Sequence, residues 1–300
     1  MNNVFVPDLI EPKRRIGAHE FDFSRRVAVM AIINRTPDSF YDAGRTYDLD
    51  AAVAASMQAI SDGADWIDVG GVPFFTPGKP KVSEAEELDR VLPVVEAIRA
   101  GSDVVISVDT DRSEVARRAI AAGANVINDT SGLHDRELAD VAAETGASIV
   151  ITHSLASPPH TRVYRPSYQD VVAEVETFLR ERVEVALGRG VQPSQIIVDP
   201  GHDLNKNTYH SLELTRRLDE ITGLRYPTLV AVSNKHFIGE ALNLPKTERM
   251  EGTVATLVVC VLQGARIVRV HDVRAATSAV RMAETIVGWR PPSYARHNLA

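Results

Sequence analysis

Short apolar runs rich in β-branched residues recur along the chain, and each is followed by a segment of helical length. Such runs predict buried β-strands, and the amphipathic or alanine-rich segments between them predict crossover helices. The strands are expected at residues 27–33, 66–69, 104–108, 125–128, 148–152, 196–198, 228–232 and 266–270. The helices are expected at residues 48–63, 83–100, 113–123, 135–146, 168–190, 208–223, 246–264 and 273–288.

The ends of several predicted helices carry their own signals. Ser83 and Ser113 each precede acidic residues at the spacing of a helix N-cap. Glycines stand where a helix would need a left-handed stop, namely Gly63, Gly123, Gly146 and Gly190. These positions set the expected helix boundaries.

Alternation of eight strands with eight helices predicts an α/β protein built as a single (β/α)8 TIM barrel. The runs are continuously apolar because parallel strands are buried on both faces. An open doubly wound sheet is the alternative, but no GxGxxG follows the first strand and polar residues end almost every strand. We expect an N-terminal extension over residues 1–26 that caps the barrel, the barrel over 27–290 and a flexible tail over 291–300.

Composition narrows the class of protein. Of 300 residues, 44% are hydrophobic and 24% charged, which supplies an ample core and excludes a disordered chain. The net charge of −7 gives no overall basic field, so neither nucleic acid nor an anionic membrane is an expected partner. The N-terminal segment carries acids and prolines instead of a secretory signal, so we expect a cytoplasmic protein. The single cysteine, Cys260, lies in an apolar run and is expected to be a buried hydrophobe.

Polar side chains gather at the carboxyl ends of the predicted strands. In a barrel the loops after the strands converge on one mouth, so these residues are expected to form one site. They are Asn34, Asp38, Asp68, Asp109, Asn128, Asp129, His153, Asp199, Ser233, Lys235, Arg269 and His271.

Two kinds of chemistry are represented in this set. Carboxylates, an amide and an ammonium suit the alternating donors and acceptors of a flat nitrogen heterocycle. These residues are Asp109, Asn128, Asp199 and Lys235. A guanidinium beside an imidazole and an amide suits a phosphate or diphosphate. These residues are Asn34, Arg269 and His271. The expected substrate is therefore a neutral ring that carries an anionic leaving group.

Eight motifs in order give the chain a resemblance to dihydropteroate synthase. The motifs are INRTPDSFYD, IDVGG, ISVDT, VINDTSG, ITHS, IVDPG with NKN, SNKHFIGE and IVRVHDV, and the likeness spans residues 27 to about 287. That family is a (β/α)8 barrel, generally a homodimer. With the help of Mg²⁺ it joins 6-hydroxymethyl-7,8-dihydropterin diphosphate to 4-aminobenzoate and releases diphosphate.

The resemblance assigns roles to the residues that match the family's motifs. Pterin binding falls to Asp109, Asn128, Asp199 and Lys235, and diphosphate binding to Asn34, Arg269 and His271. The Asn34 amide is the implied Mg²⁺ ligand, together with substrate phosphates and waters. Asp109, Asp199 and Lys235 are the candidate catalytic residues. The two carboxylates would favour the positive charge that develops on the ring methylene while the clamp stabilises departing diphosphate.

Departures from the family lie on the side of the second substrate. After IDVGG the family continues with Glu-Ser-Thr-Arg-Pro-Gly, whereas this chain has a longer, apolar segment without the acid and the arginine. An aromatic residue of the sixth loop is replaced by a leucine, and the arginine between the serine and the lysine of the seventh loop by an asparagine. The degenerate second-substrate site comprises Val72, Pro73, Phe74, Phe75, Thr76, Leu204, Ser233 and Asn234.

Further changes affect the loops and the strand ends. Asp203 and Asn205 stand where the family has permissive glycines, and Thr152 stands where methionine is common. Arg35 and Asp203 are expected to bring new charges near the mouth, where Asp203 would repel a diphosphate.

From these changes we predict a dihydropteroate synthase-like protein with little or no synthase activity and no main role in folate biosynthesis. It resembles the divergent second copy found in actinobacteria such as mycobacteria. A pterin or an aminobenzoate-like molecule is the expected ligand, and a second copy of the chain the expected partner. Two alternatives remain open: an active transferase that uses 4-aminobenzoate or another acceptor, and a non-catalytic regulatory subunit.

Overall fold

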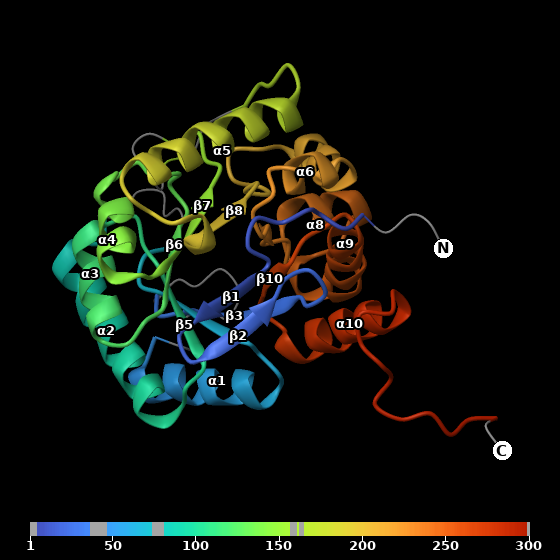
Figure 1. Ribbon diagram of the computed structural model, residues 1–300, viewed down its shortest axis with the longest axis horizontal. Helices are drawn as coiled ribbons and strands as arrows, with labels where there is room; N and C mark the ends of the chain where they lie inside the picture. The colour runs from blue at the N-terminus through green and yellow to red at the C-terminus, as the bar shows by residue number, and fades with distance from the viewer. Residues whose placement is uncertain (1–4, 37–46, 74–80, 157–160, 162–164, 299–300) are drawn as a thin grey trace.

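A computed structural model describes residues 5–36, 47–73, 81–156, 161 and 165–298. Eight parallel strands form one sheet in the order β8-β7-β6-β5-β4-β3-β10-β9, and helices surround it (Figure 1). A parallel bridge between Val198 and Thr228 joins the two ends of this order, so the sheet closes into a barrel. The strands are β3 (Ala28–Asn34), β4 (Trp66–Gly70), β5 (Val105–Asp109), β6 (Val126–Asp129), β7 (Ser148–Thr152), β8 (Ile196–Asp199), β9 (Leu229–Val230) and β10 (Ile267–Val270). The predicted (β/α)8 barrel is confirmed, and the open doubly wound sheet is excluded.

The helices follow the predicted order with two differences. The predicted helix 208–223 is two helices, broken at Arg217, whose φ of −111° and ψ of 30° depart from helical values. A seven-residue helix, α8, was not predicted because it is too short to show a helical period. The helices are α1 (Leu49–Ser61), α2 (Glu84–Gly101), α3 (Ser113–Ala121), α4 (Glu137–Thr145), α5 (Val171–Gly188), α6 (Thr208–Arg216), α7 (Leu218–Thr222), α8 (His236–Leu242), α9 (Met250–Leu262) and α10 (Val273–Ile286).

Most of the predicted helix ends are confirmed. The four glycine stops have φ between 76° and 114°, the left-handed region that glycine enters without a Cβ penalty. Ser83 Oγ accepts the backbone N–H of Glu86 at 3.2 Å and caps α2. The prediction for Ser113 is wrong, because this residue begins α3 and its hydroxyl donates to Glu137 Oε2 at 3.4 Å instead.

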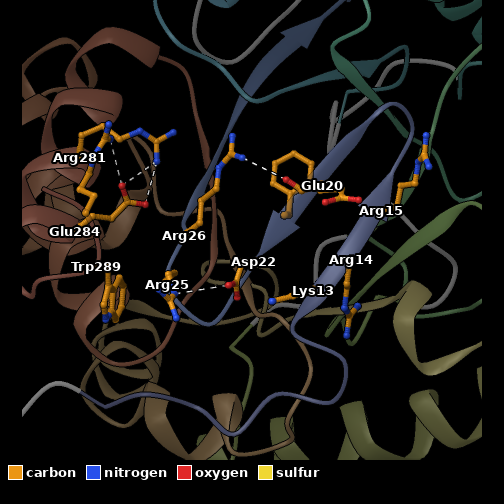
Figure 2. Close-up of a pocket in the computed structure, with 12 residues that line it drawn as sticks. Lys13, Arg14, Arg15, Glu20, Asp22, Arg25, Arg26, Arg281, Glu284 and Trp289 are labelled. Carbon is orange, nitrogen blue, oxygen red and sulfur yellow. Dashed lines mark hydrogen bonds and ion pairs between the residues drawn. The ribbon is translucent and has the colours of Figure 1, made fainter. Parts of the chain in front are cut away.

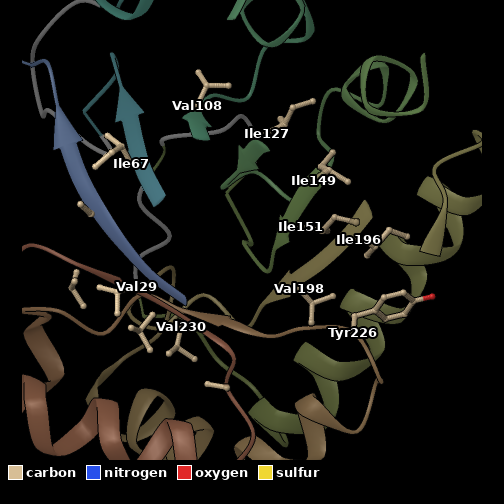
Figure 3. Packing of buried hydrophobic residues seen from close by; sticks show 14 of the residues in the cluster. Val29, Ile67, Val108, Ile127, Ile149, Ile151, Ile196, Val198, Tyr226 and Val230 are labelled. Carbon is tan, nitrogen blue, oxygen red and sulfur yellow. The ribbon is translucent and has the colours of Figure 1, made fainter. Parts of the chain in front are cut away.

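Strand side chains alternate between two environments. Val29, Ile67 and Ile149 belong to the layer between the strands and the helices, which Figure 3 shows. The residues next to them in the sequence, Met30, Trp66 and Val150, belong to a second cluster and face the barrel interior. This alternation makes the lower part of the barrel interior a dry apolar layer.

An antiparallel hairpin of β1 (Lys13–Ile16) and β2 (His19–Asp22) precedes the barrel. Its Phe21 ring stacks on Phe23 at 5.6 Å between ring centroids and meets the edge of Trp66 at 5.7 Å. The hairpin thus packs on the apolar layer at the amino ends of the strands. The opposite, carboxyl ends are where the polar strand termini lie.

None of the described helices is sufficiently long and apolar to span a bilayer. The apolar helix α9 packs in the core, where Cys260 is fully buried. Burial raises the pKa of the Cys260 thiol to about 12, so the thiol stays protonated and unreactive.

Candidate functional site

Inward-facing positions change from apolar to polar as each strand approaches its carboxyl end. Trp66 is followed two residues later by Asp68, Val126 by Asn128, and Ile197 by Asp199. Because a strand has a side-chain period of two, each polar residue points into the same interior as the apolar residue before it. The strand pattern therefore gathers carboxylates and an amide above the apolar layer.

Arg269 of β10 connects these groups. Its Nε atom donates to Asp68 Oδ2 at 2.6 Å, and its Nη2 atom donates to Asp109 Oδ2 at 2.8 Å. Asn128 Nδ2 donates to the same Asp68 oxygen at 3.1 Å. Burial tends to lower the pKa of Arg269, but the Asp68 and Asp109 carboxylates outweigh it and the pKa is raised. A permanently charged guanidinium is thus fixed in the interior by residues from separate strands.

Asp68 is the shared acceptor of this cluster, and the family comparison of motifs did not assign it a role. Its side chain is fully buried, and its Oδ1 atom has no hydrogen-bond partner among the described residues. The signal was present in the sequence, because Asp68 is an inward-facing carboxylate in an otherwise apolar strand.

Asp199 and Lys235 supply a second pair of charges. Asp199 Oδ1 accepts the backbone N–H of Gly201 at 2.7 Å, and burial raises the pKa of this carboxyl to about 6. Burial also lowers the pKa of Lys235, although the Asp203, Asp199 and Asp109 carboxylates act in the opposite sense. The predicted pterin residues are therefore close enough to influence one another electrostatically.

The predicted diphosphate residues lie along the rim of the same cluster. A Cβ atom on Gly70 would lie 3.0 Å from Asn34 Oδ1 and 3.5 Å from Asp109 Cβ, so these two side chains flank the glycine. His271 Nδ1 lies 3.0 Å from Ser233 Oγ, which also accepts the His271 backbone N–H at 3.3 Å. Ser233 is thereby engaged with the predicted diphosphate side of the site.

A resident metal centre has little support from the protein side chains. The described residues contain no group of three His, Cys, Asp or Glu side chains arranged to hold a metal ion. Mg²⁺ prefers oxygen ligands, and the Asn34 amide is the one protein ligand expected for it. Diphosphate oxygens and waters would have to supply the remaining ligands.

Among the residues of the predicted second-substrate site, Asn234 has a buried side chain. Asn234, which replaces the family's arginine, is 2% exposed, and its amide Oδ1 lies 3.4 Å from Thr253 Oγ1 of α9. Its backbone N–H donates to the same hydroxyl at 3.1 Å. Asn234 is thus part of the packing between the seventh loop and α9. Val72 and Pro73 precede the undescribed stretch 74–80, so Phe74, Phe75 and Thr76 lie outside the described residues.

Two nearby arginines are committed to backbone carbonyls. Arg35 donates to the carbonyls of Tyr47, Asp89 and Arg90 at 2.9 to 3.0 Å, which ties the end of β3 to α2. Arg249 Nη1 donates to the carbonyls of Asn234 and Lys235 at 3.0 and 3.2 Å. Both guanidinium groups therefore stabilise the local backbone.

Two residues of the sixth loop that replace the family's glycines keep a backbone conformation typical of glycine. Asp203 and Asn205 have φ of 63° and 52°, in the left-handed region that aspartate and asparagine tolerate better than most residues. Half-buried Leu204 stands between them.

The side chains of Asp203 and Asn205 connect the sixth loop to neighbouring segments. The Asp203 carboxylate accepts the Ser211 hydroxyl at 3.1 Å and the backbone N–H of His236 at 2.5 Å. Asn205 Oδ1 accepts the Ser154 hydroxyl at 3.1 Å and the Leu155 backbone N–H at 3.0 Å. The Asp203 carboxylate is therefore bonded within its own surroundings, and its repulsion of a diphosphate stays a prediction.

Two residues of the strand-end set have structural roles. The Asp129 carboxylate accepts the backbone N–H groups of Ser131 and Leu133 at 2.8 and 2.5 Å and shapes the loop after β6. His153 receives a hydrogen bond from Lys206 Nζ at 2.8 Å through Nδ1. Burial and the Lys206 charge lower the pKa of His153 to about 2, which keeps the ring neutral. A third member of the set, Asp38, lies outside the described residues.

A hollow of about 880 Å³ lies at the other end of the barrel, beside the N-terminal hairpin and α10 (Figure 2). Many of its lining residues are cationic, and two of the arginines donate to backbone carbonyls. Arg14 donates to the carbonyl of Ile196 at 2.6 Å, and Arg281 to the carbonyl of Val27 at 2.9 Å. The hollow is separate from the polar cluster at the carboxyl ends of the strands, because none of the residues of that cluster lines it.

Comparison with known proteins gives one consistent answer. Residues 30–271 match the family described as pterin binding enzyme. The chain is 44% identical over 280 residues to the inactive dihydropteroate synthase 2 of Mycobacterium leprae, covering 92% of this chain and 96% of the relative. It is 40% identical over 275 residues to the dihydropteroate synthase of Clostridium beijerinckii, covering 91% and 99%. The Xanthomonas albilineans dihydropteroate synthase in complex with 7,8-dihydropteroate superposes with a TM-score of 0.81 at 34% identity, covering 92% and 99%.

Proposed function

Because this chain belongs to the family of pterin binding enzymes, we propose that it binds a pterin at the carboxyl ends of the barrel strands but condenses it with 4-aminobenzoate slowly or not at all. The observation that carries the proposal is the contrast between the two halves of the site. The Arg269 cluster is bonded through Asp68, Asp109 and Asn128. In the seventh loop, Asn234 stands in place of the family's arginine, and its side chain is buried against α9.

The retained half has the chemistry that a pterin requires. An aminopyrimidinone ring presents N–H donors beside ring-nitrogen and carbonyl acceptors, which carboxylates, an amide and an ammonium can satisfy. Asp199 supplies a carboxylate acceptor, and Lys235 supplies a buried donor. The Asn128 amide has both a donor and an acceptor, and its Nδ2 atom already donates to Asp68. The Arg269 guanidinium and the His271 imidazole would stabilise the departing diphosphate.

The lost half concerns orientation of the amine. An acceptor must be held with its nitrogen close to the ring methylene, and correct placement accounts for much of the rate of a two-substrate reaction. Arg35 and Arg249 are committed to backbone carbonyls, so neither compensates for the missing arginine in this arrangement. Each lost polar contact would cost about 1 to 3 kcal/mol, and about 1.4 kcal/mol already reduces a rate tenfold.

The comparisons support both parts of this proposal. The Xanthomonas structure holds 7,8-dihydropteroate, a pterin derivative, in the same fold. The Mycobacterium leprae relative is named inactive. We further propose that Mg²⁺ binds with the diphosphate and that two copies of the chain associate. Exposed apolar side chains on α9 and α10, namely Val259, Met282 and Ile286, support association.

Binding and turnover measured on the same preparation test the proposal. Calorimetric titration with 6-hydroxymethyl-7,8-dihydropterin diphosphate should show a saturable site, and added 4-aminobenzoate should yield no product above the uncatalysed rate. Turnover at ordinary enzyme rates of roughly 1 to 10³ s⁻¹ would refute the impaired second half. Failure of the pterin diphosphate to bind would refute the retained half.

An active transferase with a different acceptor is the second candidate. The diphosphate rim of Asn34, Arg269 and His271 favours it, because a protein that only held the ring would not need this rim. Diphosphate release measured against a panel of amines and aromatic nucleophiles distinguishes this candidate. Acceleration by one member would support it, and uniform background release would favour the binding protein or the regulatory subunit.

A further inference from the structure

Thr152, the last residue of β7, has a buried hydroxyl that lacks a hydrogen-bond partner among the described residues. Its side chain is fully buried, and Oγ1 contacts no donor or acceptor among the residues that the structure describes. A buried hydroxyl that lacks a partner is unfavourable, so nearly all buried polar groups in folded proteins are paired with protein, water or ligand. The Thr152 hydroxyl therefore calls for a partner that the described part of the chain does not provide.

The strand pattern fixes the direction of this side chain. Ile149 and Ile151 lie in the layer between the strands and the helices (Figure 3), whereas Val150 lies in the interior cluster. Thr152 is two residues beyond Val150 and shares its inward direction. In the parallel register Thr152 is the direct neighbour of Asp199, one of the predicted pterin residues.

One side of Thr152 is already filled. Its methyl carbon Cγ2 lies 3.3 Å from the position that a Cβ atom on Gly201 would take, so the methyl is directed to the turn after β8. The hydroxyl is the other branch of the side chain and is buried in the strand position next to Asp199, whose carboxylate accepts the Gly201 backbone N–H through Oδ1.

We propose that Thr152 is a recognition residue for the bound heterocycle, and that its hydroxyl pairs with a hydrogen-bonding atom on the ring edge that faces β7 and β8. This inference rests on the proposed pterin site. A hydroxyl both donates and accepts, whereas the methionine common at this position in the family offers only a weak sulfur acceptor. This chain therefore favours a ring with a polar atom at that edge over one with an apolar edge.

Ser107 provides a matched control. Its hydroxyl is also buried and unpartnered among the described residues. It pairs in register with Asp68 and Val126, two residues before Asp109, so it lies deeper in the barrel than Thr152. A general effect of removing a buried hydroxyl should appear in both positions, whereas contact with the ring should appear only at Thr152.

Calorimetric titration with 6-hydroxymethyl-7,8-dihydropterin diphosphate tests the inference in four variants. Thr152→Val, which is nearly isosteric, should weaken binding about three- to tenfold, the range expected for one neutral hydrogen bond. Thr152→Met should also weaken it, Thr152→Ser should retain wild-type affinity, and Ser107→Ala should stay within about twofold of wild type. Unliganded Thr152→Val should unfold at the wild-type temperature or above, because an unpartnered hydroxyl is removed.

The outcomes separate this inference from the function on which it rests. Absence of binding by the wild type overturns the proposed function and the Thr152 assignment together. Binding by the wild type with unchanged affinity in Thr152→Val overturns only the Thr152 assignment. Equal weakening in Thr152→Val and Ser107→Ala also overturns it, as does an unliganded Thr152→Val that unfolds several degrees lower, which would show an internal partner for the hydroxyl.

Discussion

Arg269 Nε lies 2.6 Å from Asp68 Oδ2, which makes an ion pair between a strand near the end of the chain and the second strand of the barrel. The Asp68 side chain is fully buried, with 0% of its surface accessible to solvent. A buried charge pair of this kind contributes little net stability compared with apolar packing, but removal of one partner is costly. The pair is therefore best explained by its position in the proposed pterin site.

Replacement of Arg269 by alanine should leave Asp68 without its cation and lower the free energy of unfolding by about 3 kcal/mol. Pterin diphosphate affinity should fall at least tenfold, because we propose that the guanidinium also binds the diphosphate. Urea denaturation and calorimetry check the two effects. Arg117→Ala, which breaks the exposed pair with Glu144, is the control and should leave the denaturation midpoint unchanged. A stable Arg269→Ala with full affinity would contradict the role given to this arginine.

Asn205 combines left-handed backbone geometry with two side-chain hydrogen bonds to the loop after β7. Asn205→Ala loses both hydrogen bonds. It also puts alanine, which has no polar side chain to stabilise left-handed backbone, at a φ of 52°, so we expect about 2 kcal/mol of destabilisation. Asn205→Gly loses the bonds but relieves the backbone, so its loss should be smaller. Hydrogen exchange of the Leu155 amide should accelerate in both variants. Destabilisation of the glycine variant as large as that of the alanine variant would contradict the backbone argument.

The Asp199 carboxyl has a pKa raised to about 6 by burial. If the ionised form accepts a hydrogen bond from the ring, affinity for the pterin should be constant above pH 6 and fall up to tenfold per pH unit below it. The sign follows because protonation removes the acceptor that the ligand needs. Titrations between pH 5 and pH 8 check this dependence, and Asp199→Asn should bind weakly at every pH. Affinity that rises as the pH falls through 6 would exclude this role for the carboxylate.

Asn234 offers a direct test of the proposed loss of the second-substrate site. Reintroduction of the family's arginine by Asn234→Arg should fail to restore synthase turnover, because this side chain packs against Thr253 and is 2% exposed. The larger cationic side chain should also lower the unfolding temperature. A product assay with 4-aminobenzoate and a thermal melt provide the measurements. Recovery of turnover by this single change would show that the other loop differences are unimportant.

The candidate site could be predicted only in part from the sequence. The sequence predicts Asp109, Asn128 and Arg269 as site residues because they lie at strand ends, and hydrogen bonds join Arg269 to Asp109 directly and to Asn128 through Asp68. Asp129 meets the same criterion, yet its carboxylate is used by the backbone of its own loop. Position at a strand end predicts location, but it does not predict which hydrogen-bond partner a side chain takes.

Local signals show the same limit. Ser83 and Ser113 carry similar sequence contexts, but only Ser83 caps its helix. The backbone N–H of Ser113 is instead satisfied by Asp135 Oδ2 at 2.9 Å, a residue from another loop. Tertiary contacts override the capping preference there because the orphan donor already has an acceptor.

The alternation of apolar runs and amphipathic segments determined the barrel, since parallel strands buried on both faces must be covered by helices in turn. The period of two within each strand also determined which residues face the interior. Only the tertiary structure decided that Arg269 pairs with Asp68, 201 positions away in the chain, and that Asn234 turns to α9. Barrel closure brings such distant groups within about 3 Å of each other, and at that range geometry, not residue type, selects the partner.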